Sequence, residues 1–257
     1  MNHRSVECAI ALGGNLGTVE QRFTDAIQQL IQHSQITVTA VSRNYVTHAV
    51  GTAATGDFLN AAVVCETTLS AQQMLEFLFE LEQHAGRTRE IKWGSRTLDL
   101  DLIYYGTAEI QTDSLSVPHP AMWYRRFVLD PLNEIAPTWQ HPKRGQSIAQ
   151  FYESLTQPDR NLLFWGEKGD WFATFEQQLK DQFDFPVGVQ FLDSQQPFRA
   201  EQHKTVQMII DIRPQQTSES DQQSHPRQLP FGAVSPCNLQ DLLDLMHSMY
   251  DVPQVLS

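Results

Sequence analysis

Residues 98–105 read LDLDLIYY, and this alternation of leucine and aspartate restricts the fold more than any other stretch of the chain. Successive side chains of a β-strand point to opposite faces, so the three leucines would face a core while Asp99 and Asp101 share the other face, about 7 Å apart. Two interpretations of that polar face are open. It is either a plain solvent-facing surface or a pair of carboxylates that binds a hard cation such as Mg²⁺.

Positive charge is concentrated immediately before this strand. The chain carries a net charge of −12 and has no lysine or arginine between Arg43 and Arg87. The basic residues that follow are Arg87, Arg89, Lys92 and Arg96. A solvated loop and an anion-binding loop are both consistent with this cluster. Cations, paired carboxylates and the glycine-containing loop at residues 47–57 together suit phosphoryl transfer, because that chemistry depends on positioning and charge neutralisation.

The order of the predicted elements is β-α-β-β-α-β, which is that of a ferredoxin-like sandwich with two helices on one face of the sheet. Alternating or β-branched runs predict strands at residues 7–12, 36–46, 58–67 and 98–105. Apolar residues at helical spacing predict one helix capped by Thr18 and another that begins at Ser70 and ends before Gly86. We therefore expect an α+β fold here.

A polar, proline-containing stretch at residues 154–159 predicts a boundary between a domain at 1–157 and a small α/β domain at 158–257. In the second part, apolar runs predict strands at 162–165, 187–192 and 206–212, a helix at about 172–183 and a last helix capped by Asn238. Residues 214–230 are poor in apolar side chains and are predicted to be disordered. No chemical motif is recognisable in this part.

Composition and missing motifs exclude several classes of function. A net charge of −12 argues against nucleic-acid binding, and no apolar run approaches the roughly 20 residues of a membrane span. Neither a P-loop nor a GxGxxG fingerprint is present, so a nucleotide would have to be bound in another way. The three cysteines match no zinc-binding spacing, which favours a reduced, cytoplasmic setting.

Several segments, taken together and in order, resemble one family. They are ALGGNLG, FLNAAV, ELEQHAGR, KWGSRTLDLDLIYYG and VPHPAMWYRRFVLDPLNEIAP. They are similar to segments of 6-hydroxymethyl-7,8-dihydropterin pyrophosphokinase of the folate pathway, and the resemblance covers roughly residues 7–155. It implies the same βαββαβ fold and the transfer of pyrophosphate from ATP to the hydroxymethyl oxygen of the pterin, leaving AMP.

The resemblance also implies roles for individual residues. Asp99 and Asp101 would hold two Mg²⁺ ions that bridge the ATP phosphates, and Asp101 would take part in catalysis with Arg87 and Arg96. The pterin would be bound by Thr47, Val50, Asn60, Trp93 and Phe127, and ATP by Glu82, Arg96, His119 and Arg125. Each residue also has an ordinary structural interpretation. Phe127 could be a core residue, for example, and His119 could order a turn between two prolines.

The chain departs from the family pattern at a few positions. Gly14 stands where serine is common, His48 and Ala49 replace a frequent Pro-Pro, and Ser95 replaces a common proline. These changes bear on loop closure and rate. They leave open a second hypothesis, a regulatory protein that binds pterin and nucleotide with little turnover. The second domain could also contact another folate-pathway enzyme.

Overall fold

The structure is a computed structural model of the 257-residue chain. It describes residues 5–48, 56–86, 96–157, 160–165, 169, 171–182, 187–192, 208–211, 233–234 and 239–256. The chain divides into two compact units, of which the first comprises residues 1–153 and 247–257 and the second residues 154–246. The assignment of the second unit as a separate domain stays a prediction.

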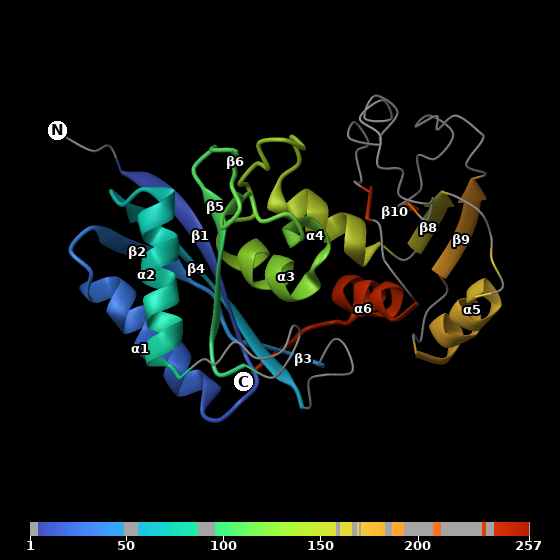
Figure 1. The fold of residues 1–257 in the computed structure, drawn as a ribbon, viewed down its shortest axis with the longest axis horizontal. Helices are drawn as coiled ribbons and strands as arrows, with labels where there is room; N and C mark the ends of the chain where they lie inside the picture. The colour runs from blue at the N-terminus through green and yellow to red at the C-terminus, as the bar shows by residue number, and fades with distance from the viewer. Residues whose placement is uncertain are drawn as a thin grey trace. The chain divides into compact units, whose positions relative to one another are not determined.

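The first unit is built on a mixed α/β arrangement with an antiparallel sheet (Figure 1). Its strands are β1 (Val6–Gly14), β2 (Ile36–Val41), β3 (Tyr45–Thr47), β4 (Phe58–Thr67), β5 (Asp99–Tyr105) and β12 (Gln254–Val255). The strands lie in the order β12-β3-β4-β1-β5, and β2 also pairs with β4. The expected strand at 36–46 is therefore wrong in one respect: it is interrupted at residues 42–44, where the hydroxyl of Ser42 accepts a hydrogen bond from the Ala62 amide in place of continuous ladder pairing.

Helices α1 (Val19–Gln32) and α2 (Ala71–His84) cover one face of this sheet (Figure 1). Ser70 begins α2 with a capping box, in which its hydroxyl accepts from the Gln73 amide while the Gln73 side chain accepts from the Ser70 amide. The predicted capping of α1 is wrong, because the Thr18 side chain makes no capping hydrogen bond. The core lies between these helices and the sheet.

The alternation that the sequence shows in β5 recurs in the neighbouring strands. In β1, Cys8, Ile10 and Leu12 belong to the core with the three leucines at 98, 100 and 102. The intervening small residues of β1, including Ala11 and Gly13, therefore lie on the opposite face. Asp99 and Asp101 share this opposite face, since Gly13 pairs with Asp99 and Ala11 pairs with Asp101.

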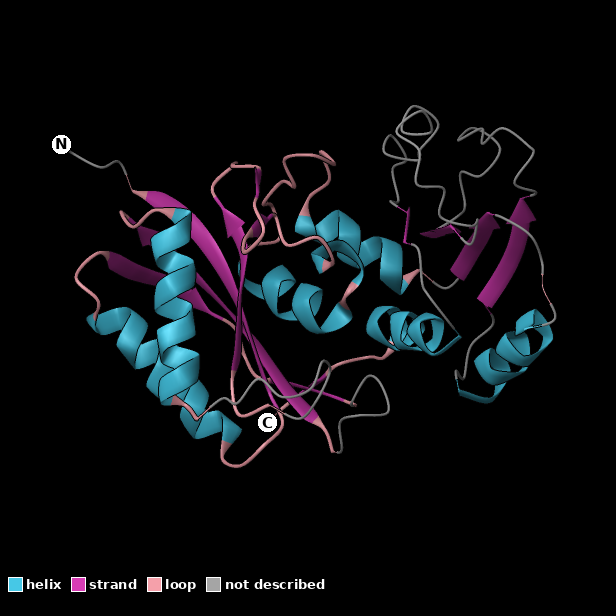
Figure 2. Cartoon of the chain, in the orientation of Figure 1, coloured by secondary structure: helices cyan, strands magenta, loops and turns pink. Residues whose placement is uncertain are grey.

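That opposite face is covered by helices that the sequence analysis did not identify as helices (Figure 2). They are the 3-10 turn η1 (Met122–Tyr124), α3 (Arg126–Ile135) and the part of α4 (Ile148–Thr156) that belongs to the first unit, and the short strands β6 (Ile110–Gln111) and β7 (Ser116–Val117) lead into them. A buried ion pair between Arg126 and Asp130, with nitrogen–oxygen distances of 2.5 and 2.8 Å, holds the first turns of α3. The chain enters η1 through a cis Val117–Pro118 bond.

The second unit has a parallel sheet of its own. Its elements are β8 (Arg160–Trp165), α5 (Trp171–Gln182), β9 (Val187–Leu192), β10 (Met208–Asp211), β11 (Ala233–Val234) and the first turns of α6 (Leu239–Tyr250). The strands lie in the order β11-β10-β8-β9, and every pair is parallel. Phe164 contacts Phe172 and Phe175 of α5 edge-on, which confirms the predicted apolar face of that helix. The predicted disordered segment at 214–230 lies outside the described residues.

No helix in the described part of the chain combines the length and apolar character needed to cross a membrane.

Candidate active site

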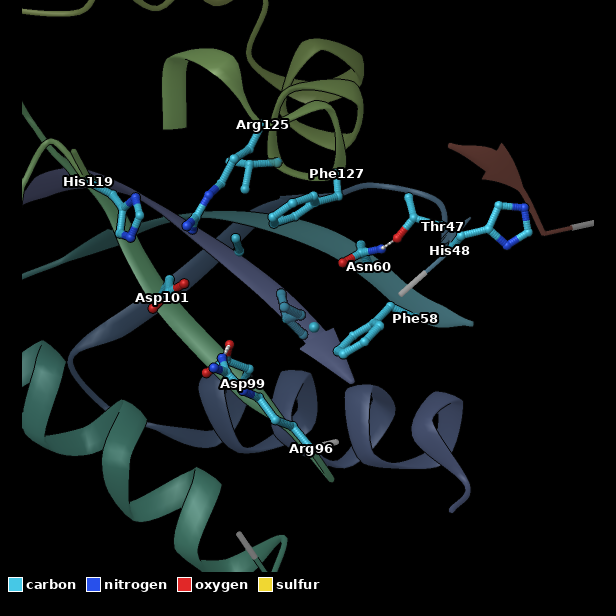
Figure 3. A pocket seen from close by; sticks show the side chains of 14 residues that line it. Thr47, His48, Phe58, Asn60, Arg96, Asp99, Asp101, His119, Arg125 and Phe127 are labelled. Atoms are coloured by element: carbon cyan, nitrogen blue, oxygen red, sulfur yellow. Dashed lines mark hydrogen bonds and ion pairs between the residues drawn. The ribbon is translucent and has the colours of Figure 1, made fainter. Parts of the chain in front are cut away.

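A cavity of about 300 Å³ opens on the face of the sheet that α3 covers (Figure 3). It is lined by Ala11, Leu12, Gly13, Thr47, His48, Phe58, Asn60, Arg96, Asp99, Asp101, His119, Arg125, Phe127 and Val128. The lining residues come from β1, β3, β4, β5, α3 and the segments that follow β3 and precede β5, η1 and α3. Residues that are far apart in the sequence therefore meet in one site.

The floor of the cavity is formed where β1 lies between β4 and β5. Gly13 pairs with Asn60 on one side and with Asp99 on the other. A Cβ atom at position 13 would lie 3.7 Å from the Asn60 Oδ1 atom and 3.8 Å from the Asp99 Cβ atom. The absence of a side chain at Gly13 therefore leaves open the space between an amide and a carboxylate.

The acidic end of the cavity contains Asp99 and Asp101, both half-buried. The Arg96 guanidinium forms an ion pair with the Asp99 carboxylate. Among the described residues, no group of three or more acidic, histidine or cysteine side chains is placed to hold a metal. Two carboxylates nevertheless fit Mg²⁺, because this ion commonly takes one or two carboxylates and completes its shell with water and substrate phosphates.

His119 and Arg125 lie above the two aspartates (Figure 3). The His119 Nδ1 atom accepts a hydrogen bond from the Ala121 amide at 3.2 Å, so the neutral ring carries its proton on Nε2. Burial, together with the nearby Arg125 charge, lowers the pKa of His119 to about 4, although Asp99 acts in the opposite direction. His119 is therefore a neutral hydrogen-bond donor at pH 7, and Arg125 supplies positive charge.

The other end of the cavity is lined by two aromatic side chains and an asparagine. Phe127 from α3 and Phe58 from β4 lie on either side of Asn60 (Figure 3). The Asn60 Nδ2 atom donates to the Thr47 hydroxyl at 2.9 Å and to the Tyr45 carbonyl at 3.4 Å. Because these bonds fix the amide and occupy its nitrogen, Asn60 presents Oδ1 to a ligand. This end suits a planar heteroaromatic ring that carries N–H donors.

The Glu134 carboxylate, which lies outside the cavity, links two of the elements that line it. Glu134 near the end of α3 accepts from the Tyr45 hydroxyl at 2.8 Å and from the Arg43 Nε atom at 3.0 Å. Burial and the bond to Glu134 raise the pKa of Tyr45 to about 12. Since Tyr45 belongs to β3, these contacts link the helix that carries Phe127 to the strand that carries Thr47.

Most of the residues expected at the site are brought together. The structure places Thr47, Asn60, Arg96, Asp99, Asp101, His119, Arg125 and Phe127 around one cavity. Glu82 is elsewhere: it is buried in α2, and its carboxylate accepts a hydrogen bond of 2.7 Å from the Leu100 amide. The expected residues Val50, Arg87 and Trp93 lie outside the described residues.

Sequence reasoning missed Phe58, His48 and the floor glycine, Gly13. Phe58 could have been found, since it stands two positions before Asn60 in a strand and must share its face. His48 borders the cavity at the end of β3, where its Nδ1 atom lies 2.9 Å from the Asp57 Oδ1 atom. His48 and Phe58 lie at the two ends of the segment that joins β3 to β4.

Paired carboxylates and cations at one end of a cavity, with two aromatic side chains at the other, suit an enzyme that transfers a phosphoryl-type group to an acceptor with an aromatic ring. The chain belongs to the 7,8-dihydro-6-hydroxymethylpterin-pyrophosphokinase (HPPK) family, whose sequence model matches residues 9–137. This confirms the resemblance noted in the sequence.

Individual relatives agree with the family match. The chain is 42% identical over 146 residues to the 2-amino-4-hydroxy-6-hydroxymethyldihydropteridine pyrophosphokinase of Synechocystis, which covers 57% of this chain and 74% of the relative. It is 46% identical over 126 residues to the enzyme of the same name from Bacillus subtilis, covering 49% of this chain and 75% of the relative.

Among solved structures, the wild-type HPPK-DHPS of Plasmodium falciparum with pteroate aligns with a TM-score of 0.47 at 9% identity. The alignment covers 82% of this chain and 57% of that longer chain.

Proposed function

We propose that the cavity is the active site of a Mg²⁺-dependent pyrophosphokinase in which Asp99 and Asp101 hold the metal ions and the Phe58–Phe127 slot holds the pterin. The activity itself follows from family membership: the chain transfers pyrophosphate from ATP to 6-hydroxymethyl-7,8-dihydropterin in folate biosynthesis. One observation supports this assignment above all. Asn60 in β4 and the two aspartates in β5, Asp99 and Asp101, lie on the same face of the sheet, on either side of β1.

The pterin end is supported by shape and by hydrogen-bonding capacity. A ring between Phe58 and Phe127 would stack on both, and such aromatic contacts add about 0.5–1.5 kcal/mol each beyond the buried area. The Asn60 Oδ1 atom would accept from the pterin N–H groups, because the amide nitrogen is already bound to Thr47. Thr47 thus orients Asn60, and we place Val50 and Trp93 at the same end by resemblance.

The phosphate end is supported by charge. Arg125 would attract the anionic phosphates, and His119 would donate its Nε2 proton to a phosphate oxygen without adding charge. Mg²⁺, when bound, would draw the phosphate oxygens together and make the transferred phosphorus a better electrophile. Arg96 lines the cavity beside Asp99, and we propose that it neutralises phosphate charge together with Arg87.

The acceptor hydroxyl must lose a proton as the new oxygen–phosphorus bond forms. Asp101 lies on the cavity face of β5, where it pairs with Ala11. We assign Asp101 the role of helping to orient the acceptor hydroxyl and receive that proton. Glu82, expected to contact ATP, is supported here as a positioning residue, because it fixes the Leu100 amide between the two aspartates.

Broader expectations remain proposals as well. The strand order and the two helices on one face support a ferredoxin-like arrangement, and the separate parallel sheet supports a second α/β domain. The use of ATP supports a cytoplasmic setting. A contact between the second unit and another folate-pathway enzyme stays a prediction.

The decisive experiment is AMP release from ATP, the pterin alcohol and Mg²⁺. We expect Asp99→Ala to lower turnover by about 100-fold or more, as the loss of one main transition-state contact does, while calorimetry still detects pterin binding. Asp113→Ala, an exposed aspartate on the turn between β6 and β7, is the matched control and should leave turnover unchanged. Near-normal turnover in Asp99→Ala would contradict the metal role, and pterin binding without turnover in the unmodified chain would favour the regulatory protein.

A further inference from the structure

Residues 254–256 add a strand to the kinase sheet from the far end of the sequence. In β12, Gln254 pairs with Val46 and Val255 pairs with Tyr45, both in β3. The Leu256 amide also donates to the Asn44 carbonyl at 2.9 Å. These residues belong to the first unit, although the 93 residues of the second unit, 154–246, come before them in the chain. They lie outside the family match at 9–137.

The strand that β12 pairs with carries the pterin end of the site. β3 is only three residues long, and on its other side it pairs with β4 so that Tyr45 faces Asn60 and Thr47 faces Phe58. Without β12, β3 would be an edge strand with one row of backbone groups unpaired, and such short edges are easily displaced. Pairing on both sides holds β3, and with it the Thr47 hydroxyl that accepts from Asn60.

The Leu256 side chain is 40% exposed and borders a hollow next to the site. It lines a shallow hollow on the other side of β3 and β4, together with Val46, Phe58 and Leu59. Phe58 borders both this hollow and the main cavity. Figure 3 shows β12, in faint red, beside Thr47 and His48.

We propose that residues 254–256 form a positioning element for the pterin subsite, acting through the β3 backbone on Thr47 and through the Leu256 side chain on Phe58. The inference rests on the proposed pterin slot and adds a determinant from outside the family region. It assigns to residues 254–256 a role in acceptor binding and none in ATP binding, because Arg96, His119 and Arg125 lie towards the other end of the cavity, near the two aspartates (Figure 3).

The test separates the backbone bond from the side chain in the full-length chain. Leu256→Pro removes the amide that donates to Asn44, Leu256→Ala keeps the amide and removes the packing, and Val252→Ala alters a strongly exposed residue nearby as a control. The loss of one such hydrogen bond predicts a rise in the pterin KM of about three- to tenfold for Leu256→Pro. We expect a smaller rise for Leu256→Ala and none for Val252→Ala, with the KM for ATP unchanged in all three.

The outcomes distinguish this proposal from the proposed function. If both Leu256 variants kept the pterin KM of the unmodified chain, or raised both KM values equally, the positioning role would be wrong while the site assignment would stand. If Leu256→Pro did not fold, the pterin KM and the calorimetric pterin affinity of Leu256→Ala would decide in the same way. If the unmodified chain released no AMP, the proposed function would fail, and calorimetric pterin affinity alone would test the positioning role.

Discussion

Alanine at position 13 should strengthen the fold and at the same time obstruct the pterin subsite. Glycine within a strand costs roughly 0.5–1 kcal/mol relative to alanine, because the unfolded chain has more backbone freedom to lose. The new methyl group would meet Asn60 and Asp99 at 3.7 and 3.8 Å, which is ordinary van der Waals contact. We therefore expect Gly13→Ala to raise the free energy of unfolding by up to about 1 kcal/mol.

The same methyl group would stand on the floor of the cavity, between the Asn60 amide that we propose binds the pterin and the Asp99 carboxylate that we propose binds metal. Forcing a ligand against one extra methyl group costs about 1–3 kcal/mol, so the pterin KM should rise roughly five- to a hundredfold. Urea unfolding and initial-rate kinetics measure the two effects separately.

Gly14→Ala is the matched comparison, with the opposite pattern. A Cβ atom there would lie 2.9 Å from Val19 Cγ1 and 3.0 Å from the Thr97 carbonyl oxygen, and the backbone oxygen cannot move aside. We expect Gly14→Ala to lose about 1–3 kcal/mol of stability, with little change in pterin KM for the folded protein. If Gly13→Ala bound the pterin as well as the unmodified chain does, the cavity floor would not be part of the pterin site.

Two further predictions concern buried polar groups. Burial, followed by the charges of Arg144 and Lys143, lowers the pKa of His141 from 6.5 to about 4, so the unfolded chain binds more protons between these values. The contribution of neutral His141 to the free energy of unfolding should be fully present above pH 6.5 and should fall by up to about 3 kcal/mol as the pH drops to 4. In urea unfolding, the free energy of unfolding of His141→Gln should decrease less steeply between pH 6.5 and 4. An unchanged decrease would contradict the assignment. Glu82→Ala removes the acceptor of the Leu100 amide, so it should lower the free energy of unfolding by about 1–3 kcal/mol and also lower kcat/KM. Glu82→Gln keeps an acceptor and should retain most of the stability, measured by denaturation, and most of the activity, measured by AMP release.

Local sequence patterns predicted those elements whose position depends on residues close together in the sequence. The alternation at 98–105 placed three leucines in the core and both aspartates on the opposite face, because a one-residue shift would bury both carboxylates. Ser70 began α2 as expected, since its capping box is closed by residues only three apart. Both features depend on neighbours in the sequence.

The rest of the site depends on contacts that no local pattern records. α3 was not recognised as a helix because its segment contains Pro131 and because its buried Arg126–Asp130 pair looks like solvent-facing charge in the sequence. The role of Glu134 depends on Arg43 and Tyr45, about 90 residues away. The tight space around Gly14 likewise became visible only in the structure, where Val19 and Thr97 lie next to it.

The return of the chain to β3 after the second unit changes how this protein should be dissected. A shortened version that stops near Gln157 would lose β12 together with the second unit, and any defect would be attributed to the wrong part of the chain. The informative variant is an internal excision that joins residue 153 to residue 247 through a flexible spacer, so that the kinase keeps the six described strands of its main sheet.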